Sequence, residues 1–307
     1  MRHLDNESLH CFLEAVRHGS ISSASRSLGL AQPALTRRIQ LLEEHFGDRL
    51  LSRHRRGIEL TETGAIVAKR GEEILRMSQE LADEVRSMVG RPAGLVRFGF
   101  PPSVGMLFVG RILAECVSRF NDVKLHLVEN VSPAVREALI DNRLDMAIMS
   151  CRSGHESLRC VPLFHEQLWL FAAPDLWTLP PGSVSVDALQ ELPVMLASFL
   201  MQHLENKVPL RVMAAVDALP LAREALFERA GYGIFPYSAL EREFKRGELY
   251  GAPISGLTVS RGLFFRKDRT TSNAMRLVED LVKARVSMLI SERNDMFQEV
   301  LGDDYIV

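Results

Sequence analysis

Residues 19–44 read GSISSASRSLGLAQPALTRRIQLLEE, and this stretch decides the fold of the N-terminal part of the chain. Ser20 offers a side-chain oxygen that can cap a helix beginning at Ile21. Gly29 suits the left-handed conformation that closes such a helix. Pro33 fits the first turn of a following helix, because the amide hydrogen that proline lacks would have no partner there. The stretch therefore predicts two short helices joined at Gly29, which is the helix-turn-helix pattern.

The second of these helices, expected from residue 32 to about residue 45, is predicted to have two different faces. At about 100° per residue, Leu35, Ile39 and Leu42 fall on one side and predict a buried contact with the preceding helices. The opposite side is mainly polar, and it holds Pro33, Thr36, Arg37, Gln40 and Glu44. Such side chains hydrogen-bond base edges and phosphates. With Gln32 at its start, the helix matches a docking mode in which the N-terminal half enters the major groove.

A two-stranded wing is predicted next, because β-prone apolar residues flank an arginine-rich turn. Arg53, Arg55 and Arg56 lie at its tip, where they suit phosphate clamping or insertion into a minor groove. Between residues 26 and 56, seven arginines stand against three acidic residues, a local balance of +4 in a chain of net charge −2. Charge alone favours an ordinary solvated surface. The expectation of DNA binding therefore depends on the helix-turn-helix and the wing together.

Residues 9–64 resemble the N-terminal domain of LysR-type transcriptional regulators. Many spaced positions carry the resemblance: Gly19-Ser20-Ile21, Ala24, Leu28, Gln32-Pro33-Ala34-Leu35-Thr36, Ile39, Leu42-Glu43, Gly47, Leu50-Leu51, Arg53, Leu60-Thr61 and Gly64. The departures are mild, with Ser25 where a second alanine is usual, Thr36 in place of serine and Leu51 in place of phenylalanine. The resemblance implies that six side chains contact DNA: Gln32, Pro33, Thr36, Arg37, Arg53 and Arg56.

Residues 62–89 contain no proline and predict one long helix. Val67, Ile74, Leu81 and Met88 recur every seven residues, which indicates a coiled-coil seam whose alternate row is only partly filled. The alternative is a helix packed on its own domain. Dimerisation is favoured, because paired DNA half-sites need two recognition helices held by a symmetric contact, and members of the family use this helix in that way. The stretch GRPAG at residues 90–94 then breaks the helix and indicates a hinge.

The remaining two-thirds of the chain predicts an α/β fold. Strand-like and helical segments alternate over residues 95–150, which favours a parallel sheet with helices on its faces. A second set of such segments begins near residue 167, and a late strand at residues 262–266 precedes a helix at residues 272–289. Members of the LysR family have an effector domain with two α/β lobes like those of periplasmic binding proteins. Residues 231–236, GYGIFP, resemble a motif of their second lobe.

These patterns divide the chain into a winged helix-turn-helix domain at residues 1–64, a linker helix at residues 65–90 and an effector domain of two lobes. The first lobe is expected at residues 91–163 and 263–290, the second at residues 164–262, and a C-terminal tail at residues 291–307. A dimer formed through the linker helix would pair with a second dimer, which gives a tetramer.

An effector pocket is expected between the lobes, because ligands of open α/β sheets bind beyond the carboxyl ends of the strands. Two predicted strands run directly into helix starts, where free N–H groups suit an anion such as a carboxylate. Ser103 and Ser132 lie at these helix starts, and Ser198 follows a strand of the second lobe. We therefore expect Ser103, Ser132 and Ser198 to line the pocket. The alternative is that each serine only caps its own helix.

Other features exclude several kinds of protein. The four cysteines show no metal spacing, no 18-residue apolar run is present and the first residues do not form a signal sequence, so a cytoplasmic protein without a cofactor or membrane contact is expected. Cys151 and Cys160 invite interpretation as a redox switch, but inert thiols are favoured because only neighbouring arginines could stabilise a thiolate. No nucleophile elbow, P-loop or dinucleotide motif is readable.

The leading interpretation is therefore a non-enzymatic regulator that binds double-stranded DNA and a small anionic effector. One alternative is an enzyme with an incidental helix-turn-helix, which a catalytic constellation would reveal. The other is an architectural DNA-binding protein without an effector, which a screen for stabilising ligands would distinguish.

Overall fold

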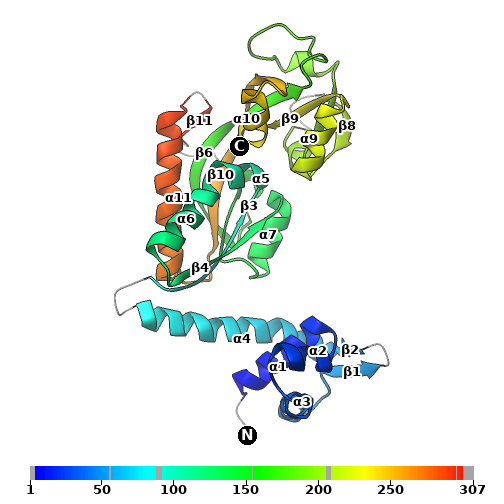
Figure 1. Ribbon diagram of the computed structural model, residues 1–307, viewed down its shortest axis with the longest axis vertical. Coiled ribbons are helices and arrows are strands. Elements are labelled where there is room, and N and C mark those ends of the chain that lie inside the picture. Colours follow the sequence, from blue (N-terminus) through cyan, green and yellow to red (C-terminus); the bar gives the residue numbers. More distant parts are fainter. Residues whose placement is uncertain are drawn as a thin grey trace. The chain divides into compact units, whose positions relative to one another are not determined.

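The computed structural model describes residues 4–54, 57–87, 92–153, 155–204, 209–294 and 296–299. The chain divides into two compact units, Met1–Val89 and Gly90–Val307, and each is described by itself (Figure 1).

The N-terminal unit begins with three helices that surround one core. They are α1 (Asn6–His18), α2 (Ile21–Ser27) and α3 (Gln32–Phe46). Asp5 caps α1 by accepting hydrogen bonds from the amides of Glu7 and Ser8, and the Ser20 hydroxyl caps α2 as its sequence predicts. Leu35 and Ile39 of α3 are fully buried against Phe12 of α1, so the aliphatic face of α3 points inward as predicted.

The wing consists of β1 (Leu51–His54) and β2 (Gly57–Leu60), which pair antiparallel. Gly57 has a φ of +137°, and a Cβ placed there would lie 2.5 Å from the carbonyl oxygen of Gly19. The amide of Ile58 donates a hydrogen bond of 3.1 Å to that same oxygen. The wing is therefore anchored on the turn that follows α1, and only glycine permits so close an approach.

The long helix α4 (Glu62–Ser87) has a buried and an exposed apolar row. Val67 belongs to the core around α1, which places it outside the sevenfold seam predicted for it. The core takes this residue because the first turns of α4 pack on α1. Ile74 and Leu81 of that seam are exposed, and Met77 and Val85 lie beside them with exposures of 64% and 57%. Met88 lies outside the described residues.

One mixed sheet runs through the C-terminal unit, in the order β4-β3-β5-β10-β6-β9-β7-β8, with β11 paired to β6. The strands are β3 (Gly94–Phe100), β4 (Val123–Glu129), β5 (Met146–Ser150), β6 (Leu158–Ala172), β7 (Pro193–Leu196), β8 (Arg211–Ala215), β9 (Tyr232–Pro236), β10 (Tyr250–Arg266) and β11 (Phe297–Gln298). Strands β3, β4 and β5 are parallel to one another in the first lobe, as are β7, β8 and β9 in the second.

The two lobes share the long strands β6 and β10, which pair antiparallel with each other. The parallel arrangement expected for the strand segments of residues 95–150 is confirmed by β3, β4 and β5. The strand segments expected near residues 168–172 and 262–266 are only the ends of β6 and β10. Pro162 and Pro253 interrupt the apolar runs that the sequence pattern relies on. Both prolines lie in the pairing between β6 and β10. They lie outside the spans that pair with β9 (residues 168–171) and with β5 (residues 261–264), so the amide hydrogen that proline lacks is not needed by those strands.

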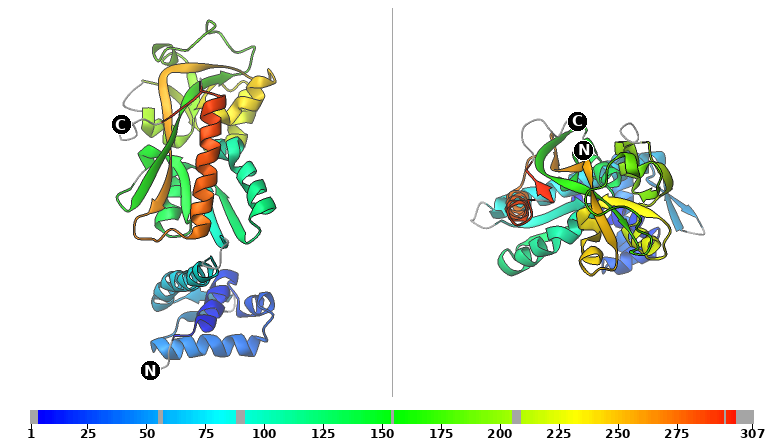
Figure 2. Two further views of the ribbon diagram at one scale, coloured as in Figure 1. Left: turned by 90° about the vertical axis from the view of Figure 1, so that its left-hand side faces the viewer. Right: turned by 90° about the horizontal axis from the view of Figure 1, so that it is seen from above.

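Helices cover this sheet: α5 (Pro102–Val104), α6 (Gly110–Arg119), α7 (Ser132–Ile140), α8 (Ser198–Leu204), α9 (Leu219–Phe227), α10 (Tyr237–Lys245) and α11 (Asn273–Glu292). Two single 3₁₀ turns, η2 (Cys151–Ser153) and η3 (Asp187–Leu189), complete the elements. Between α5 and α6 lies a π-helical turn, η1 (Gly105–Val109). Helix α11 runs lengthwise beside β6 and packs on it and on β3 (Figure 2).

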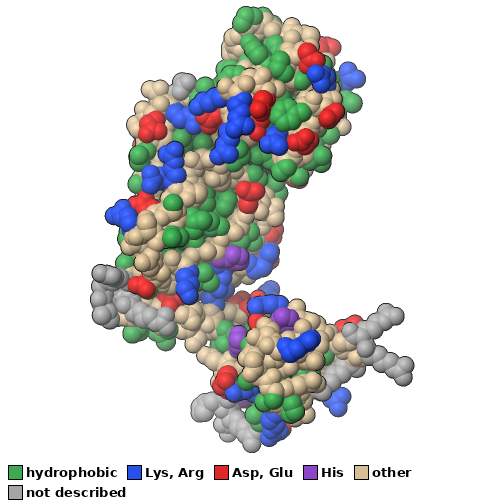
Figure 3. All heavy atoms as spheres, in the orientation of Figure 1, with side chains coloured by type: hydrophobic (Ala, Val, Ile, Leu, Met, Phe, Trp, Pro, Cys, Tyr) green, Lys and Arg blue, Asp and Glu red, His purple; other side chains and the backbone are tan. Residues whose placement is uncertain are grey.

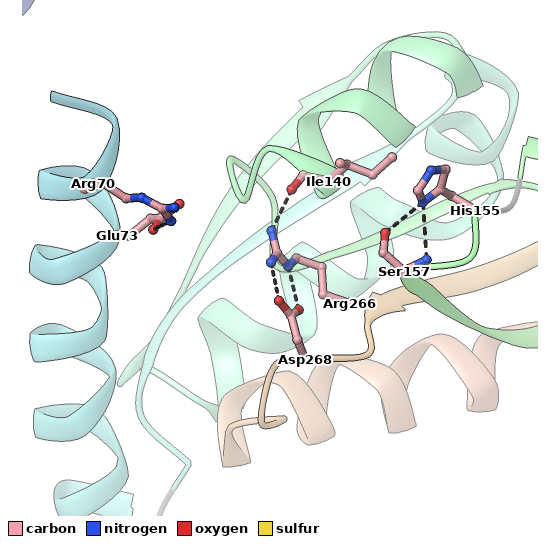
Figure 4. A network of polar contacts seen from close by, with 7 residues as sticks. All are labelled: Arg70, Glu73, Ile140, His155, Ser157, Arg266 and Asp268. Atoms are coloured by element: carbon pink, nitrogen blue, oxygen red, sulfur yellow. Dashed lines mark hydrogen bonds and ion pairs between the residues drawn. The ribbon is translucent and has the colours of Figure 1, made fainter. Parts of the chain in front are cut away.

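Ion pairs close the lower end of the first lobe. Arg266, the last residue of β10, donates to both carboxylate oxygens of Asp268 and to the carbonyl of Ile140 at the end of α7 (Figure 4). The buried carboxylate of Asp145 accepts a 2.7 Å hydrogen bond from the amide of Arg97 and pairs with Arg269. These contacts hold the β5, β10 and α7 ends together, so this lobe is a firm support for one wall of the site described below.

Candidate functional site

The outer face of α3 carries the side chains expected to contact DNA. Gln32, Pro33, Arg37 and Gln40 are exposed, and Thr36 is half-buried. Arg37 lies 3.3 Å from Glu44 on the same face, and both side chains are more than half exposed. An exposed ion pair of this kind contributes little stability. The Arg37 guanidinium can therefore leave the Glu44 carboxylate and bind a phosphate or a base edge instead.

The neighbouring Arg38 has a different role from Arg37. Its guanidinium lies 2.7 Å from Glu7 of α1 and is only 28% exposed. The pair ties α3 to α1, so one turn of α3 carries one arginine toward solvent and one toward the protein. The Arg53 side chain and the whole of Arg55 and Arg56 lie outside the described residues.

A cavity of about 430 Å³, including space open to solvent, lies between the two lobes of the C-terminal unit. It is lined by Pro101, Pro102, Ser103, Val131, Ala197, Phe199, Val216, Asp217, Leu219, Phe235, Pro236, Ala239 and Arg261. Most of these residues directly follow the carboxyl ends of β3, β4, β7, β8 and β9. The cavity thus occupies the position where open α/β sheets bind ligands.

The three serines expected at this cavity lie in three different environments. Ser103 lines the cavity, and its Oγ accepts a 3.2 Å hydrogen bond from Nη2 of Arg261. Ser132 is fully buried, accepts a 3.2 Å hydrogen bond from the amide of Ser150 and is not among the residues that line the cavity. Ser198 is exposed.

The amide and hydroxyl of Ser198 both donate to the carboxylate of Asp217, at 2.8 and 2.9 Å. Its neighbours Ala197 and Phe199 line the cavity in its place. Ser198 therefore contributes to this wall indirectly, through its hydrogen bonds to Asp217, whereas Phe199 lines the cavity where Ser198 was expected. The effector roles expected of the three serines remain predictions.

Sequence patterns missed the two charged groups at the centre of this region, Arg261 and Glu166. Arg261 lies on β10 and Glu166 on β6, and neither side chain is exposed. The available signal was the arginine inside the β-prone stretch TVSRGLFF at residues 258–265. Charged residues are almost never fully buried unless they are paired, so burial of this stretch implied a partner that the sequence does not identify.

Glu166 is held from the second lobe. Its Oε1 accepts hydrogen bonds from the amide of Ser238, at 2.9 Å, and from the Ser238 hydroxyl. Burial raises the pKa of Glu166, and the charge of Arg261 opposes that shift. Burial likewise lowers the pKa of Arg261, opposed by Glu166.

The Arg261 guanidinium has unused hydrogen-bonding capacity. Its Nη2 donates to Ser103, whereas its Nε and Nη1 are buried and have no hydrogen-bond partner among the residues the structure describes. The Nε lies 3.7 Å from Oε2 of Glu166, which is beyond hydrogen-bonding distance. Arg261 lines the cavity, so this unused hydrogen-bonding capacity belongs to a residue of the cavity wall.

Two family models match the chain. Residues 7–65 match the bacterial regulatory helix-turn-helix protein of the LysR family, and residues 90–287 match the LysR substrate binding domain. The chain belongs to the LysR family of transcriptional regulators. It is thus a DNA-binding regulator with an effector-binding domain, and its family is not one of enzymes. The alternative of an enzyme with an incidental helix-turn-helix is thereby set aside, and the effector-binding domain argues against an architectural protein without an effector.

Curated relatives of this LysR-type regulator are also transcription regulators. The HTH-type transcriptional regulator BbuR of Bordetella bronchiseptica is 26% identical over 295 residues, which cover 92% of this chain and 90% of BbuR. The HTH-type transcriptional regulator TdcA of Escherichia coli is 32% identical over 169 residues, 54% of either protein.

Solved structures show the same fold. CbnR in complex with its target DNA has a TM-score of 0.70 at 18% identity, covering 92% of this chain and all of that one. A full-length variant of OxyR from Pseudomonas aeruginosa has a TM-score of 0.69 at 17% identity, covering 94% of this chain and 96% of that one. In the described parts of this LysR-type regulator, no helix is both long and apolar enough to cross a membrane.

Proposed function

We propose that an anionic small molecule, bound between the lobes, controls DNA binding by this LysR-type regulator. The single observation that carries the proposal is the buried guanidinium of Arg261, a residue that lines the cavity and whose Nη1 lacks a hydrogen-bond partner among the described residues. A buried polar group without a partner costs free energy. An anion in the cavity that accepts a hydrogen bond from Nη1 would remove that cost.

The ligand would bias the arrangement of the lobes because the cavity has walls from both. Ser103 and Val131 belong to the first lobe, and Phe199 and Phe235 to the second. A ligand that touches both walls stabilises the lobe arrangement in which it makes both sets of contacts. In this proposal that shift changes the spacing of the DNA-binding units and the bend they impose on DNA.

DNA contact is proposed for the outer face of α3 and for the wing. Gln32, Pro33, Thr36, Arg37 and Gln40 would reach base edges and nearby phosphates, because they occupy the polar side of a helix whose other side is fully buried. Arg53, Arg55 and Arg56 would hold phosphates or enter a minor groove.

Self-association is proposed through α4. Ile74, Met77, Leu81 and Val85 form an exposed apolar row at spacings of three and four residues. Such a row is typical of a helix that packs on a second helix. Two copies joined in this way would present two α3 helices to a dyad-symmetric site, and two such dimers would form the tetramer.

The DNA proposal is tested by selecting bound sequences from genomic fragments and measuring affinity for the selected site against salt. Substitution Arg37→Ala should relax base preference at one position of each half-site, with a loss of about 1–3 kcal/mol on the selected sequence. The charge-matched control Arg246→Ala, on an exposed residue of the C-terminal unit, should leave preference unchanged. Equal preference profiles for Arg37→Ala and the wild type would exclude Arg37 from base recognition.

A further inference from the structure

The cavity between the lobes contains few polar groups. Ser103, Asp217 and Arg261 are its polar side chains among the described lining residues, and the other lining residues are apolar or proline. Phe199 and Phe235 supply aromatic rings, and the Arg261 guanidinium lies 5.8 Å from the centroid of the Phe199 ring. A ligand that fills this space therefore meets hydrocarbon over most of its surface.

The charges of the lining nearly cancel. Arg261 is the one cation among the described residues that line the cavity, and Asp217 contributes a carboxylate to the opposite wall. Behind Arg261, Glu166 already supplies a buried carboxylate 3.7 Å away. Figure 3 shows both acidic and basic side chains on the face of this unit that is in view.

We propose that the cavity selects a monoanion with an apolar body, such as an aromatic monocarboxylate, and disfavours dicarboxylates and polar phosphate esters. This inference rests on the proposed function and assigns its ligand class. One carboxylate accepts from Nη1 of Arg261, and its apolar body packs against Phe199, Phe235 and Val131. A second carboxylate would have to enter an apolar wall or face Asp217, and both arrangements are unfavourable.

Asp217 is therefore the residue that sets selectivity by charge. It is held in place by two hydrogen bonds from Ser198, so its carboxylate keeps a defined position at the wall. Replacing it by asparagine removes the negative charge and leaves an amide oxygen that can still accept from Ser198. The substitution Asp217→Asn should strengthen dianion binding more than monoanion binding, because a dianion carries the larger charge that Asp217 repels.

The test is calorimetric titration of the full-length chain with four probes: benzoate, its neutral counterpart benzyl alcohol, the dianion phthalate and glycerol 3-phosphate. Benzoate should bind at least about tenfold more tightly than each of the other three, which corresponds to about 1.4 kcal/mol. In Asp217→Asn the ratio of benzoate to phthalate affinity should fall at least about threefold. Binding to the selected DNA reports that each variant is folded.

Four results would overturn the inference. Tighter binding of phthalate or glycerol 3-phosphate than of benzoate would refute the monoanion class but leave the proposed anionic effector standing. Benzyl alcohol binding as tightly as benzoate, or none of the four probes binding, would refute the anion site and the proposed effector control together. An unchanged ratio in Asp217→Asn would refute the selectivity assigned to Asp217. Loss of benzoate binding in Arg261→Lys, with DNA binding retained, would support recognition by the directed N–H groups of a guanidinium.

Discussion

Glu166 and Arg261 form a fully buried ion pair in which Oε2 of the glutamate lies 3.7 Å from Nε of the arginine. The two residues lie on β6 and β10, the strands that both lobes share. Each reaches one lobe, since Glu166 accepts from Ser238 of α10 and Arg261 donates to Ser103 of α5. The pair therefore links β6 and β10, the strands that both lobes share, to both walls of the cavity.

Removing one member of this pair should destabilise the protein far more than removing both. A buried charge without its partner costs about 3–5 kcal/mol, whereas an apolar pair of similar volume can be nearly neutral. We expect Arg261→Met and Glu166→Leu each to lower the free energy of unfolding strongly. The double variant should be more stable than the sum of the single effects by at least about 1 kcal/mol. Urea unfolding of all four proteins measures this, and additive effects would show that the two residues do not interact.

The stability of the C-terminal unit should fall with rising pH because of Glu166. Burial raises the pKa of this carboxyl in the folded protein above its ordinary value of 4.5. A raised pKa means that the folded state favours the protonated form of Glu166. The stability that this carboxyl contributes to folding is therefore fully present below pH 4.5 and is lost as the pH rises through the pKa of Glu166 in the folded protein. Relative to Glu166→Gln, the wild type should lose stability as the pH rises above that ordinary value. Parallel stability curves for the two proteins would contradict the raised pKa.

Substitution Leu81→Glu should convert dimers to monomers. Leu81 is 64% exposed in the middle of the apolar row on α4, so a carboxylate there would be buried only in the dimer. Ala65→Glu is the matched control, because it adds the same exposed charge about 160° away around the same helix. Sedimentation equilibrium should show a weaker dimer for Leu81→Glu alone. Equal weakening by both variants would place the dimer contact elsewhere.

The thiols of Cys151 and Cys160 should differ in reactivity. Both sulfurs border Gly262, since a Cβ built there would lie 3.1 Å from one and 2.5 Å from the other. A hydrogen bond with Cys160, together with burial, raises the pKa of Cys151, and the same hydrogen bond lowers the pKa of Cys160. Iodoacetamide near pH 8 should therefore alkylate Cys160 first, as peptide mass spectrometry would record. In Cys151→Ser the rate at Cys160 should change, and faster alkylation of Cys151 in the wild type would refute the assignment.

Local periodicity was sufficient for the helix-turn-helix and the wing. The two faces of α3, the cap at Ser20 and the wing follow from residues that are neighbours in the chain. Periodicity could not assign Val67, because a seven-residue repeat fits both a dimer seam and an intramolecular contact. In the structure Val67 makes the intramolecular contact, because it packs in the core around α1.

The cavity shows the same division at its serines. The sequence located the strand ends where the cavity forms, and Ser103 does line it. Hydroxyl direction, however, depends on which amide or carboxylate lies nearby in space. The Ser132 hydroxyl oxygen accepts a hydrogen bond from the amide of Ser150, and the Ser198 hydroxyl donates one to the carboxylate of Asp217.

By itself, the amino-acid sequence determined the helix-turn-helix, the alternation of strands and helices and the family, because these are written in spacings of a few residues. Only the tertiary structure decided that Arg261 lies buried against Glu166 at the cavity, because pairing of β6 with β10 brings together side chains that are 95 positions apart. No local pattern encodes a partner at that separation. Because both side chains are buried, each charge loses its hydration and must be stabilised by an opposite charge or by hydrogen bonds within the protein.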